Sequence, residues 1–345
     1  MTTHLTILGG GTIGCFLGAA LASTGRRVTI LARPPLVEAH ARGLLRARPL
    51  GGRDEAATTA LRVVSSMRDL PETDGVLITT KTKDLASIAQ AWVARGVAPS
   101  APGWGLQNGL RSQQILAKAG VREPRAGSVT FNVVRDEGQL IQTTSGSVLL
   151  PRDPPCAVTR LMCEGLRQAG VQCRAVDDIG AALRGKLVLN LNNGICASTG
   201  LTIKASVLNA SARRCFQLAV QEALEVFRAA GLPVARVGRI PPRLLPRLLP
   251  HPTAILQRLA PAFIQIDPQA RSSTLQDVLA SRPTEVRALH GAVSEVARAH
   301  GGGGAPVNDH IVDTVEGIAA GPGPARFVSA EQLLSDLRRV RRSQS

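Results

Sequence analysis

Short apolar runs alternate with longer segments of helical period through the first half of the chain. The predicted strands are 4–8, 26–33 and 75–80, and 103–109 is predicted to be a further strand and its turn. The predicted helices are 15–24, 84–94 and 110–120. Three further strands are expected at 126–134, 139–142 and 147–150, closing this half as a meander. Alternating strands and helices are typical of an α/β domain built on a parallel sheet.

From Asp177 onward the apolar period is helical. Helices are predicted over 178–199 and 210–231, whereas eight prolines between 233 and 268 predict short turns instead of a long helix. Segment 272–301 is predicted to be helical on both sides of Pro283, with this proline in the first turn of the second helix. The last 25 residues predict a peripheral helix and a basic, solvated tail.

These patterns place the chain in the α/β class, with an N-terminal α/β domain followed by an all-helical C-terminal domain. The expected domains are 1–177 and 178–320, with 321–345 as the peripheral helix and tail. A length of 345 residues fits two domains of ordinary size.

The net charge of +16 is compatible with binding to nucleic acid, to an anionic membrane surface, or to an anionic substrate and cofactor. Aromatic residues make up only 2% of the chain and tyrosine is absent, so the stacking platforms that bind single-stranded nucleic acid are missing. The chain also has no uninterrupted apolar run long enough to cross a bilayer. We therefore expect neither a nucleic-acid nor a membrane partner.

The six cysteines form no C-x-x-C pair and no metal-ligand spacing with histidine, which predicts reduced thiols and no metal. The apolar stretch 5–22 could be mistaken for a signal peptide, but it lacks a basic leader and is interrupted by glycines. A cytoplasmic location is the expectation.

Residues 4–14, HLTILGGGTIG, run from an apolar strand into a Gly9-x-Gly11-x-x-Gly14 turn that opens a helix. In a dinucleotide site the first glycine makes the turn, the second lets the backbone approach the pyrophosphate, and the third lets the helix pack on the strand. The pyrophosphate would lie at the helix N-terminus. In this context the motif predicts a dinucleotide site, so the N-terminal domain is expected to be a Rossmann-type dinucleotide-binding domain.

Arg33 follows the second predicted strand, where NAD sites usually carry Asp or Glu, and the first acidic residue beyond it is Glu38. A guanidinium suits a 2′-phosphate, which favours NADPH; an ordinary solvated arginine is the alternative. Lys81 and Asn108 fall just beyond the carboxyl ends of predicted strands, where open α/β sheets hold their ligands.

The run KLVLNLNN, residues 186–193, places one lysine and three asparagines in an apolar helix. Lys186, Asn190 and Asn193 stand at i, i+4 and i+7, so they share one helix face. A lysine near the helix end with asparagine caps is the structural alternative. A desolvated lysine can release a proton, which an arginine cannot do usefully.

Taken together, these motifs resemble the ketopantoate reductase (2-dehydropantoate 2-reductase) family of NADPH-dependent enzymes. The resemblance runs up to about Glu316 through GGGTIG, KTKD, LQNG, GKLVLN, SSTLQD, RPTE and GAPVND, in that order. The family fold is a Rossmann domain followed by an all-helical domain, with the active site in the cleft between them. The implied cofactor is NADP(H), and the implied substrate is a small 2-oxo acid.

Site residues are implied by the same matches. The pyrophosphate loop would comprise Gly9, Gly11, Thr12, Ile13 and Gly14, and Arg33 would contact the 2′-phosphate. Lys81 and Asn108 would contact both nicotinamide and substrate, while Asn190, Asn193 and Ser273 would bind substrate. Lys186 would be the catalytic general acid, and Glu285 would complete the active centre.

The chain departs from the family pattern at three places near these motifs. Gly194 stands where many members have an asparagine, Phe131 lies in a region where some have histidine, and Arg287 stands where an acidic residue is common. The alternatives are therefore a reductase of another 2-oxo acid or ketone, and a non-catalytic NADPH-binding sensor. Members of the family occur as monomers and as dimers, and a homodimer is the expectation.

Overall fold

The computed structural model describes residues 3–43, 45–52, 60–96, 100–136, 139–238, 240–259, 267–321 and 323–343. The chain divides into two compact units. Unit 1 comprises Met1–Gln107 and Arg111–Gly180, and unit 2 comprises Asn108–Leu110 and Ala181–Ser345. The short loop Asn108–Leu110 thus packs with the second half of the chain, although it follows a strand of the first half.

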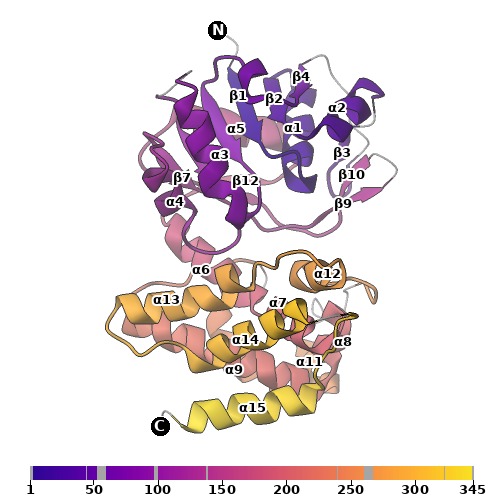
Figure 1. The fold of residues 1–345 in the computed structure, drawn as a ribbon, viewed down its shortest axis with the longest axis vertical. Helices are drawn as coiled ribbons and strands as arrows, with labels where there is room; N and C mark the ends of the chain where they lie inside the picture. The colour runs from indigo at the N-terminus through magenta and orange to yellow at the C-terminus, as the bar shows by residue number, and fades with distance from the viewer. Residues whose placement is uncertain are drawn as a thin grey trace. The chain divides into compact units, whose positions relative to one another are not determined.

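Unit 1 is built on a six-stranded parallel sheet of order β4-β2-β1-β5-β6-β7 (Figure 1). The strands are β1 His4–Leu8, β2 Arg27–Leu31, β4 Leu61–Val64, β5 Gly75–Ile78, β6 Gly103–Gly105 and β7 Pro124–Ala126. The central strands are almost wholly apolar because helices cover both faces of such a sheet. The predicted Rossmann-type α/β class is confirmed.

Successive side chains of β1 enter two different cores, as the alternation along a strand requires. Leu5 and Ile7 pack with α1 (Thr12–Ser23) and α5 (Ala157–Gln168). Leu8 packs with α3 (Thr82–Ala94) and α4 (Ser112–Lys118). A further helix, α2 (Pro34–Ala41), follows β2, and a short 3₁₀ turn, η1, spans Met67–Asp69.

Two small sheets accompany the main sheet, and they show that the predicted meander is wrong. One has the order β3-β10-β9 and the other β12-β11-β8. Their strands are β3 Arg46–Arg48, β8 Ser128–Val129, β9 Val133–Asp136, β10 Gln139–Gln142, β11 Val148–Pro151 and β12 Cys173–Val176. Strand β10 pairs antiparallel with β9, which precedes it directly, and parallel with the distant β3. Strand β11 pairs antiparallel with β8 and parallel with β12, not with β10. The sequence pattern also missed α5 and β12.

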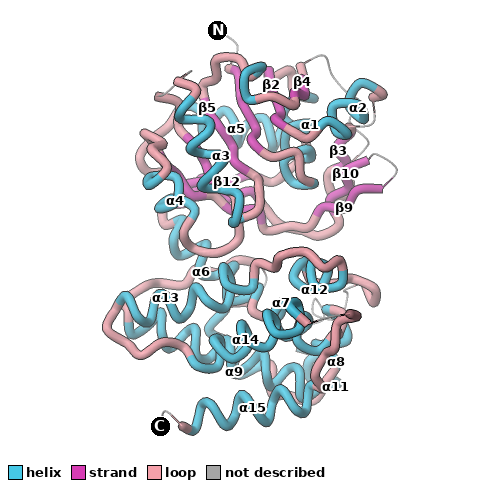
Figure 2. The backbone as a smooth tube through the Cα atoms, in the orientation of Figure 1, coloured by secondary structure: helices cyan, strands magenta, loops and turns pink. Residues whose placement is uncertain are grey.

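Unit 2 is helical, and in the described part of the chain all strands belong to unit 1 (Figure 2). The helices are α6 Ile179–Asn190, α7 Asn192–Thr199, α8 Ile203–Leu208, α9 Ala210–Ala229, α10 Leu245–Leu248, α11 Thr253–Leu259, α12 Ser273–Leu279, α13 Ala292–Ala299, α14 Pro306–Ala320 and α15 Ala330–Arg342. The 3₁₀ turn η2 (Pro242–Leu244) and the π-helical turn η4 (Arg287–Gly291) complete the unit.

Helix α9 forms the centre of the unit 2 core. Phe216, Val220 and Phe227 recur at helical spacing and are buried, and the Asn209 side chain caps the helix by accepting a hydrogen bond from Ala212 N at 2.9 Å. Leu333 and Leu337 of α15 are buried in the same core. Helix α15, expected to be peripheral, is therefore part of the packed unit.

Pro283 does not open a helix. Residues 282–285 are irregular and the helix begins at Val286, so the predicted first-turn proline is wrong. The proline-rich segment does form short pieces, η2, α10 and α11, as predicted; residues 239 and 260–266 lie outside the described part of the chain.

Candidate active site

The glycine turn between β1 and α1 has the geometry of a pyrophosphate loop. Gly9 adopts φ +124°, and a Cβ on it would lie 2.8 Å from Thr80 N. A Cβ on Gly14 would lie 2.1 Å from Gly9 O, so the close approach of α1 to the turn requires glycine there. A Cβ on Gly11, by contrast, would meet nothing within 4 Å. The open side of the loop is thus at Gly11.

The N-terminus of α1 fits an anion. Gly11 is its N-cap and provides no side-chain cap, and the first turn, which begins at Thr12 and Ile13, contains no acidic residue. The first backbone N–H groups of a helix have no partner within the helix, and the helix dipole adds positive potential there. This end of α1 can therefore hold the pyrophosphate of a dinucleotide.

Arg33 follows β2 and is the N-cap residue of α2. Its side chain is exposed, and it makes no hydrogen bond or ion pair to the rest of the described chain. The guanidinium is thus available to a ligand, and residues 26–37 around it contain no Asp or Glu.

Lys81 is the N-cap residue of α3, directly after the β5 segment of unit 1. A residue that sequence reasoning missed supports this region. The buried Gln107 side chain donates from Nε2 to Ile78 O at 2.8 Å and to Thr80 O at 3.1 Å. Gln107 therefore ties the carboxyl ends of β5 and β6 together, immediately before the chain enters unit 2.

Asn108 and Glu285 meet inside unit 2. Asn108 Nδ2 donates to Glu285 Oε2 at 3.1 Å, although the two residues are 177 positions apart. Gly109, with φ +92°, lies against the turn η4, since a Cβ there would be 2.6 Å from Ala288 O. The LQNG loop and the segment after RPTE therefore form one local structure.

Lys186 lies on α6 and is partly buried. Burial lowers the pKa of Lys186 to about 8, and the carboxylate of Glu285 acts in the opposite direction by stabilising the ammonium. A lysine with this pKa is protonated at neutral pH yet gives up its proton far more readily than an ordinary lysine. Both properties suit a general acid.

Asn190 ends α6 and Asn193 lies in the first turn of α7, with Leu191 between the two helices. Both asparagines are partly buried, and neither side chain makes a hydrogen bond to another described residue. Each amide offers donors and an acceptor that a polar ligand can use. Lys186 and these two asparagines, the asparagine stripe, thus follow one another along α6 and the first turn of α7.

Asn192, the third asparagine of the run, has a structural role. It is buried and donates to Ser206 Oγ at 2.9 Å and, more weakly, toward Cys196 Sγ at 3.7 Å. Nearby, the buried Ser272 donates to Asn193 O at 3.3 Å and caps α12 by accepting from Leu275 N. Ser273, the serine predicted to contact substrate, is exposed at the start of α12. The structure thus brings Ser272, and not Ser273, to the asparagine stripe.

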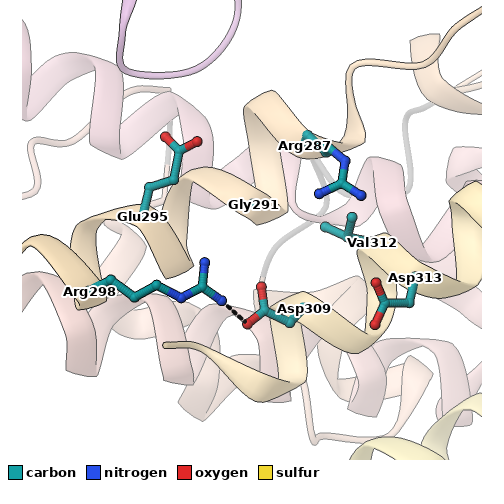
Figure 3. A pocket seen from close by; sticks show the side chains of 7 residues that line it. All are labelled: Arg287, Gly291, Glu295, Arg298, Asp309, Val312 and Asp313. Atoms are coloured by element: carbon teal, nitrogen blue, oxygen red, sulfur yellow. Dashed lines mark hydrogen bonds and ion pairs between the residues drawn. The ribbon is translucent and has the colours of Figure 1, made fainter. Parts of the chain in front are cut away.

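Two of the three departures from the family pattern have partners of their own. Phe131 is buried in the core of unit 1, edge-to-face with Phe16 at a centroid distance of 5.6 Å. Arg287 is exposed and forms an ion pair with Glu316, beside a surface hollow of about 320 Å³ that also contains the Arg298–Asp309 pair (Figure 3). Lys186 and Glu285 do not line this hollow.

The cysteines are free thiols, and five of the six are buried. Cys163 and Cys173 approach each other, with 2.7 Å between their sulfurs. Across the described ranges, no group of His, Cys, Asp and Glu side chains is arranged to hold a metal ion. The described helices also include none with the length and apolarity needed to span a bilayer.

A parallel sheet with an open glycine turn, combined with a helical unit that carries a low-pKa lysine among amides, defines a nicotinamide-dependent oxidoreductase. The chain belongs to the ketopantoate reductase PanE/ApbA family. Residues 5–154 match the model "Ketopantoate reductase PanE/ApbA", and residues 178–319 match "Ketopantoate reductase PanE/ApbA C terminal". The predicted family resemblance is confirmed.

Individual relatives agree with this assignment. The 2-dehydropantoate 2-reductase of Archaeoglobus fulgidus is 28% identical over 323 residues, which cover 92% of this chain and 98% of the relative. A PanE/ApbA family ketopantoate reductase structure from Ralstonia eutropha JMP134 has a TM-score of 0.75 at 24% identity, covering 92% of this chain and 98% of its own. A D-mandelate dehydrogenase solved with NADH and anilino(oxo)acetate has a TM-score of 0.74 at 19% identity, covering 96% and 100%. These structural similarities show the fold.

Proposed function

We propose that this protein reduces the 2-oxo group of ketopantoate to the hydroxyl of pantoate with NADPH, using Lys186 as the general acid. The observation that carries the proposal is the environment of Lys186. Its pKa is lowered to about 8 by burial, Glu285 stabilises its ammonium, and the unpaired amides of Asn190 and Asn193 share its helix face.

The residues of unit 1 supply the cofactor-binding groups in this proposal. Gly9, Gly11 and Gly14 admit the pyrophosphate at the N-terminus of α1, and Arg33 pairs with the 2′-phosphate. When bound, the reduced nicotinamide supplies the hydride. Lys81, just after β5, is assigned to the nicotinamide and substrate side of this unit.

The residues of unit 2 supply the proton and orient the substrate. The Lys186 ammonium stabilises negative charge that develops on the carbonyl oxygen and then donates its proton to that oxygen. Glu285 keeps Lys186 protonated and is itself held by Asn108. The amides of Asn190 and Asn193 orient the hydroxyl and carboxylate of the substrate.

A 2-oxo acid other than ketopantoate is the second candidate. The observation behind it is Ser273, which the family resemblance assigns to the substrate but which is exposed in this chain, with Ser272 in the nearer position. A changed substrate contact alters selectivity without altering the proton donor, because pocket shape sets the choice of substrate.

The experiment that tests the function follows NADPH absorbance during steady-state turnover of ketopantoate and a panel of aliphatic and aromatic 2-oxo acids, with NADH as the comparison cofactor. Fast turnover of ketopantoate with NADPH supports the proposal. Preferential turnover of another 2-oxo acid supports the second candidate. Saturable NADPH binding without any turnover would leave only a non-catalytic NADPH-binding protein.

The pH dependence of reduction follows from the pKa of Lys186. Because the protonated lysine is the acid, kcat is expected to be level below a pH of about 8 and to fall above it as the proton is lost. Oxidation of the alcohol needs the neutral lysine as a base, so kcat in that direction should rise over the same range. The measurement is kcat against pH in both directions.

Glu285→Gln tests the cause of that pH dependence. The Glu285 carboxylate raises the pKa of Lys186, so its removal should move the descending limb of the reduction profile to lower pH. NADPH affinity serves as the control for folding. If the descending limb of the kcat–pH profile stayed at the same pH, Glu285 would not influence the pKa of Lys186.

Arg33→Ala tests the cofactor preference. Loss of the guanidinium should reduce the preference for NADPH over NADH by about 10- to 100-fold, since a hydrogen bond to a charged group contributes about 1.5–3 kcal/mol. NADH kinetics should change little. Arg27→Ala, an exposed arginine at the opposite end of β2, is the matched control. Equal loss with both cofactors would contradict the 2′-phosphate assignment.

A further inference from the structure

His290 is a histidine that the proposed chemistry does not use. It lies in the π-helical turn η4, and its side chain is fully buried within unit 2. Its Nδ1 is 2.7 Å from Asn308 Oδ1, and its Nε2 is 3.0 Å from the backbone carbonyl oxygen of Leu191. A buried imidazole with both nitrogens in contact with polar atoms fixes the structure around it.

The contact with Asn308 leads to a buried carboxylate. Asn308 Nδ2 donates to Glu222 Oε2 at 2.8 Å and to Ala219 O at 3.2 Å. Glu222 also accepts hydrogen bonds from Val307 N and Asn308 N, both at 2.9 Å, in the first turn of α14. A continuous chain of contacts therefore runs from Glu222 through Asn308 and His290 to Leu191.

The contacts from Glu222 to Leu191 can be made in two protonation states without placing two hydrogen-bond acceptors opposite each other. In the first, Glu222 is ionised and the His290 imidazolium donates from both nitrogens. In the second, Glu222 is protonated and the Asn308 amide is turned over, so that the neutral ring accepts at Nδ1 and donates from Nε2. This turn also replaces the Asn308 bond to Ala219 O with a contact between two acceptor oxygens. Burial raises the pKa of Glu222 and lowers the pKa of His290 to about 4, so burial disfavours the charges that the first arrangement requires.

Both arrangements have the same consequence at the far end of the chain of contacts. In each of them, His290 Nε2–H donates to the Leu191 carbonyl. Leu191 is the N-cap residue of α7 and separates it from α6. A direct bond from His290 therefore restrains the junction between the helix that carries Lys186 and Asn190 and the helix that carries Asn193.

Gly194 makes room for this imidazole. A Cβ at position 194 would lie 2.2 Å from His290 Nε2 and 2.6 Å from its Cδ2, with Ile311 Cγ2 at 2.7 Å. The absence of a side chain at Gly194 therefore does not enlarge a ligand pocket, because His290 fills the space beside it. Any side chain at 194 would displace the ring from the Leu191 carbonyl.

We infer that His290 is a positioning residue. By holding the Leu191 carbonyl at the α6–α7 junction, and with Gly194 admitting its ring, it fixes the directions in which Asn190 and Asn193 present their amides to a 2-oxo acid. This inference rests on the proposed function. Its expected signature is a defect in substrate handling with unchanged cofactor binding, since small displacements of orienting groups reduce catalysis strongly.

The test compares two amide substitutions at the same site. The glutamine side chain in His290→Gln places an N–H at nearly the position of Nε2, so it can still donate to the Leu191 carbonyl. The shorter asparagine side chain in His290→Asn cannot reach this carbonyl, and the hydrogen bond is lost. His290→Asn should raise KM for the 2-oxo acid and lower kcat, reducing kcat/KM by about 10- to 100-fold, with the NADPH Kd within about twofold of wild type. His290→Gln should recover most of that loss. His300→Asn, in an exposed histidine after α13, is the control and should change neither parameter.

Gly194→Ala provides the second route, because its methyl group pushes on the ring without altering His290 itself. It should reproduce the His290→Asn defect, and this comparison still decides the matter if His290→Asn does not fold. Equal kcat/KM in the Gln and Asn variants, or normal substrate KM in Gly194→Ala, would overturn the role of His290. The proposed function fails separately, if the wild-type protein turns over no 2-oxo acid. If the wild-type protein is active and the variants behave like it, only the role of His290 fails.

Discussion

Replacing Lys186 by alanine is expected to reduce kcat for 2-oxo acid reduction by about 10²–10⁴-fold, the range that a positioned general acid contributes. The affinity for NADPH should be nearly unchanged, because Lys186 lies in unit 2 whereas the glycine turn and Arg33 lie in unit 1. Burial lowers the pKa of Lys186 to about 8, so a readily released proton is lost together with a positive charge. Stopped-flow reduction and NADPH titration measure the two effects separately.

Lys186→Arg separates the charge from the proton. Arginine keeps the positive charge but does not release its proton at ordinary pH, so it should recover little of the lost kcat if proton donation is the main contribution. Lys204→Ala is the matched control, since Lys204 is a partly buried lysine on α8 of the same unit. Wild-type turnover by Lys186→Ala would refute the assignment of the general acid.

Alanine at Gly11 and at Gly14 is expected to produce two different defects, although the glycines are three residues apart. At Gly14 the new Cβ would lie 2.1 Å from Gly9 O, so the free protein should lose about 1–3 kcal/mol or more of its free energy of unfolding. At Gly11 the new Cβ meets no protein atom within 4 Å, so stability should be kept. The methyl group would instead lie where the pyrophosphate approaches, and NADPH affinity should fall by about tenfold or more.

Chemical denaturation of each variant in the absence of cofactor measures its free energy of unfolding. NADPH titration of the folded variants measures their affinity for the cofactor. Gly25→Ala is a useful reference, because Gly25 is open to solvent but has φ +78°, which isolates the cost of backbone strain from that of a clash. Normal NADPH affinity in Gly11→Ala would show that the dinucleotide does not approach this loop.

The three residues that depart from the family pattern have different structural surroundings. Phe131 belongs to the core of unit 1, and Arg287 forms a surface ion pair with Glu316. Gly194 is explained by His290, which occupies the space that a side chain at position 194 would need. The family resemblance assigns Ser273 to the substrate; Ser273 is exposed at the start of α12, whereas the buried Ser272 donates to Asn193 O.

The features that the sequence predicted well are local. The glycine turn depends on the conformations of neighbouring residues, and the stripe of Lys186, Asn190 and Asn193 depends on helical period, which survives the junction at Leu191 because that residue is itself helical in φ and ψ. The order of strands and helices in unit 1 follows from apolar runs that need only a sheet buried on both faces. These properties are specified by a few consecutive side chains.

The features that the sequence did not predict join residues far apart in the chain. The meander failed because β10 takes a parallel partner, β3, from a distant segment, and β11 pairs with β8 and β12 in a separate sheet. The loop Asn108–Leu110 joins unit 2 through Glu285 and Ala288. His290 reaches Leu191 across 99 positions. The sequence by itself therefore determined the fold class, the glycine turn and the stripe of Lys186, Asn190 and Asn193. Only the tertiary structure decided which groups pack around them, because such contacts depend on the packing of whole helices and carry no periodic signal.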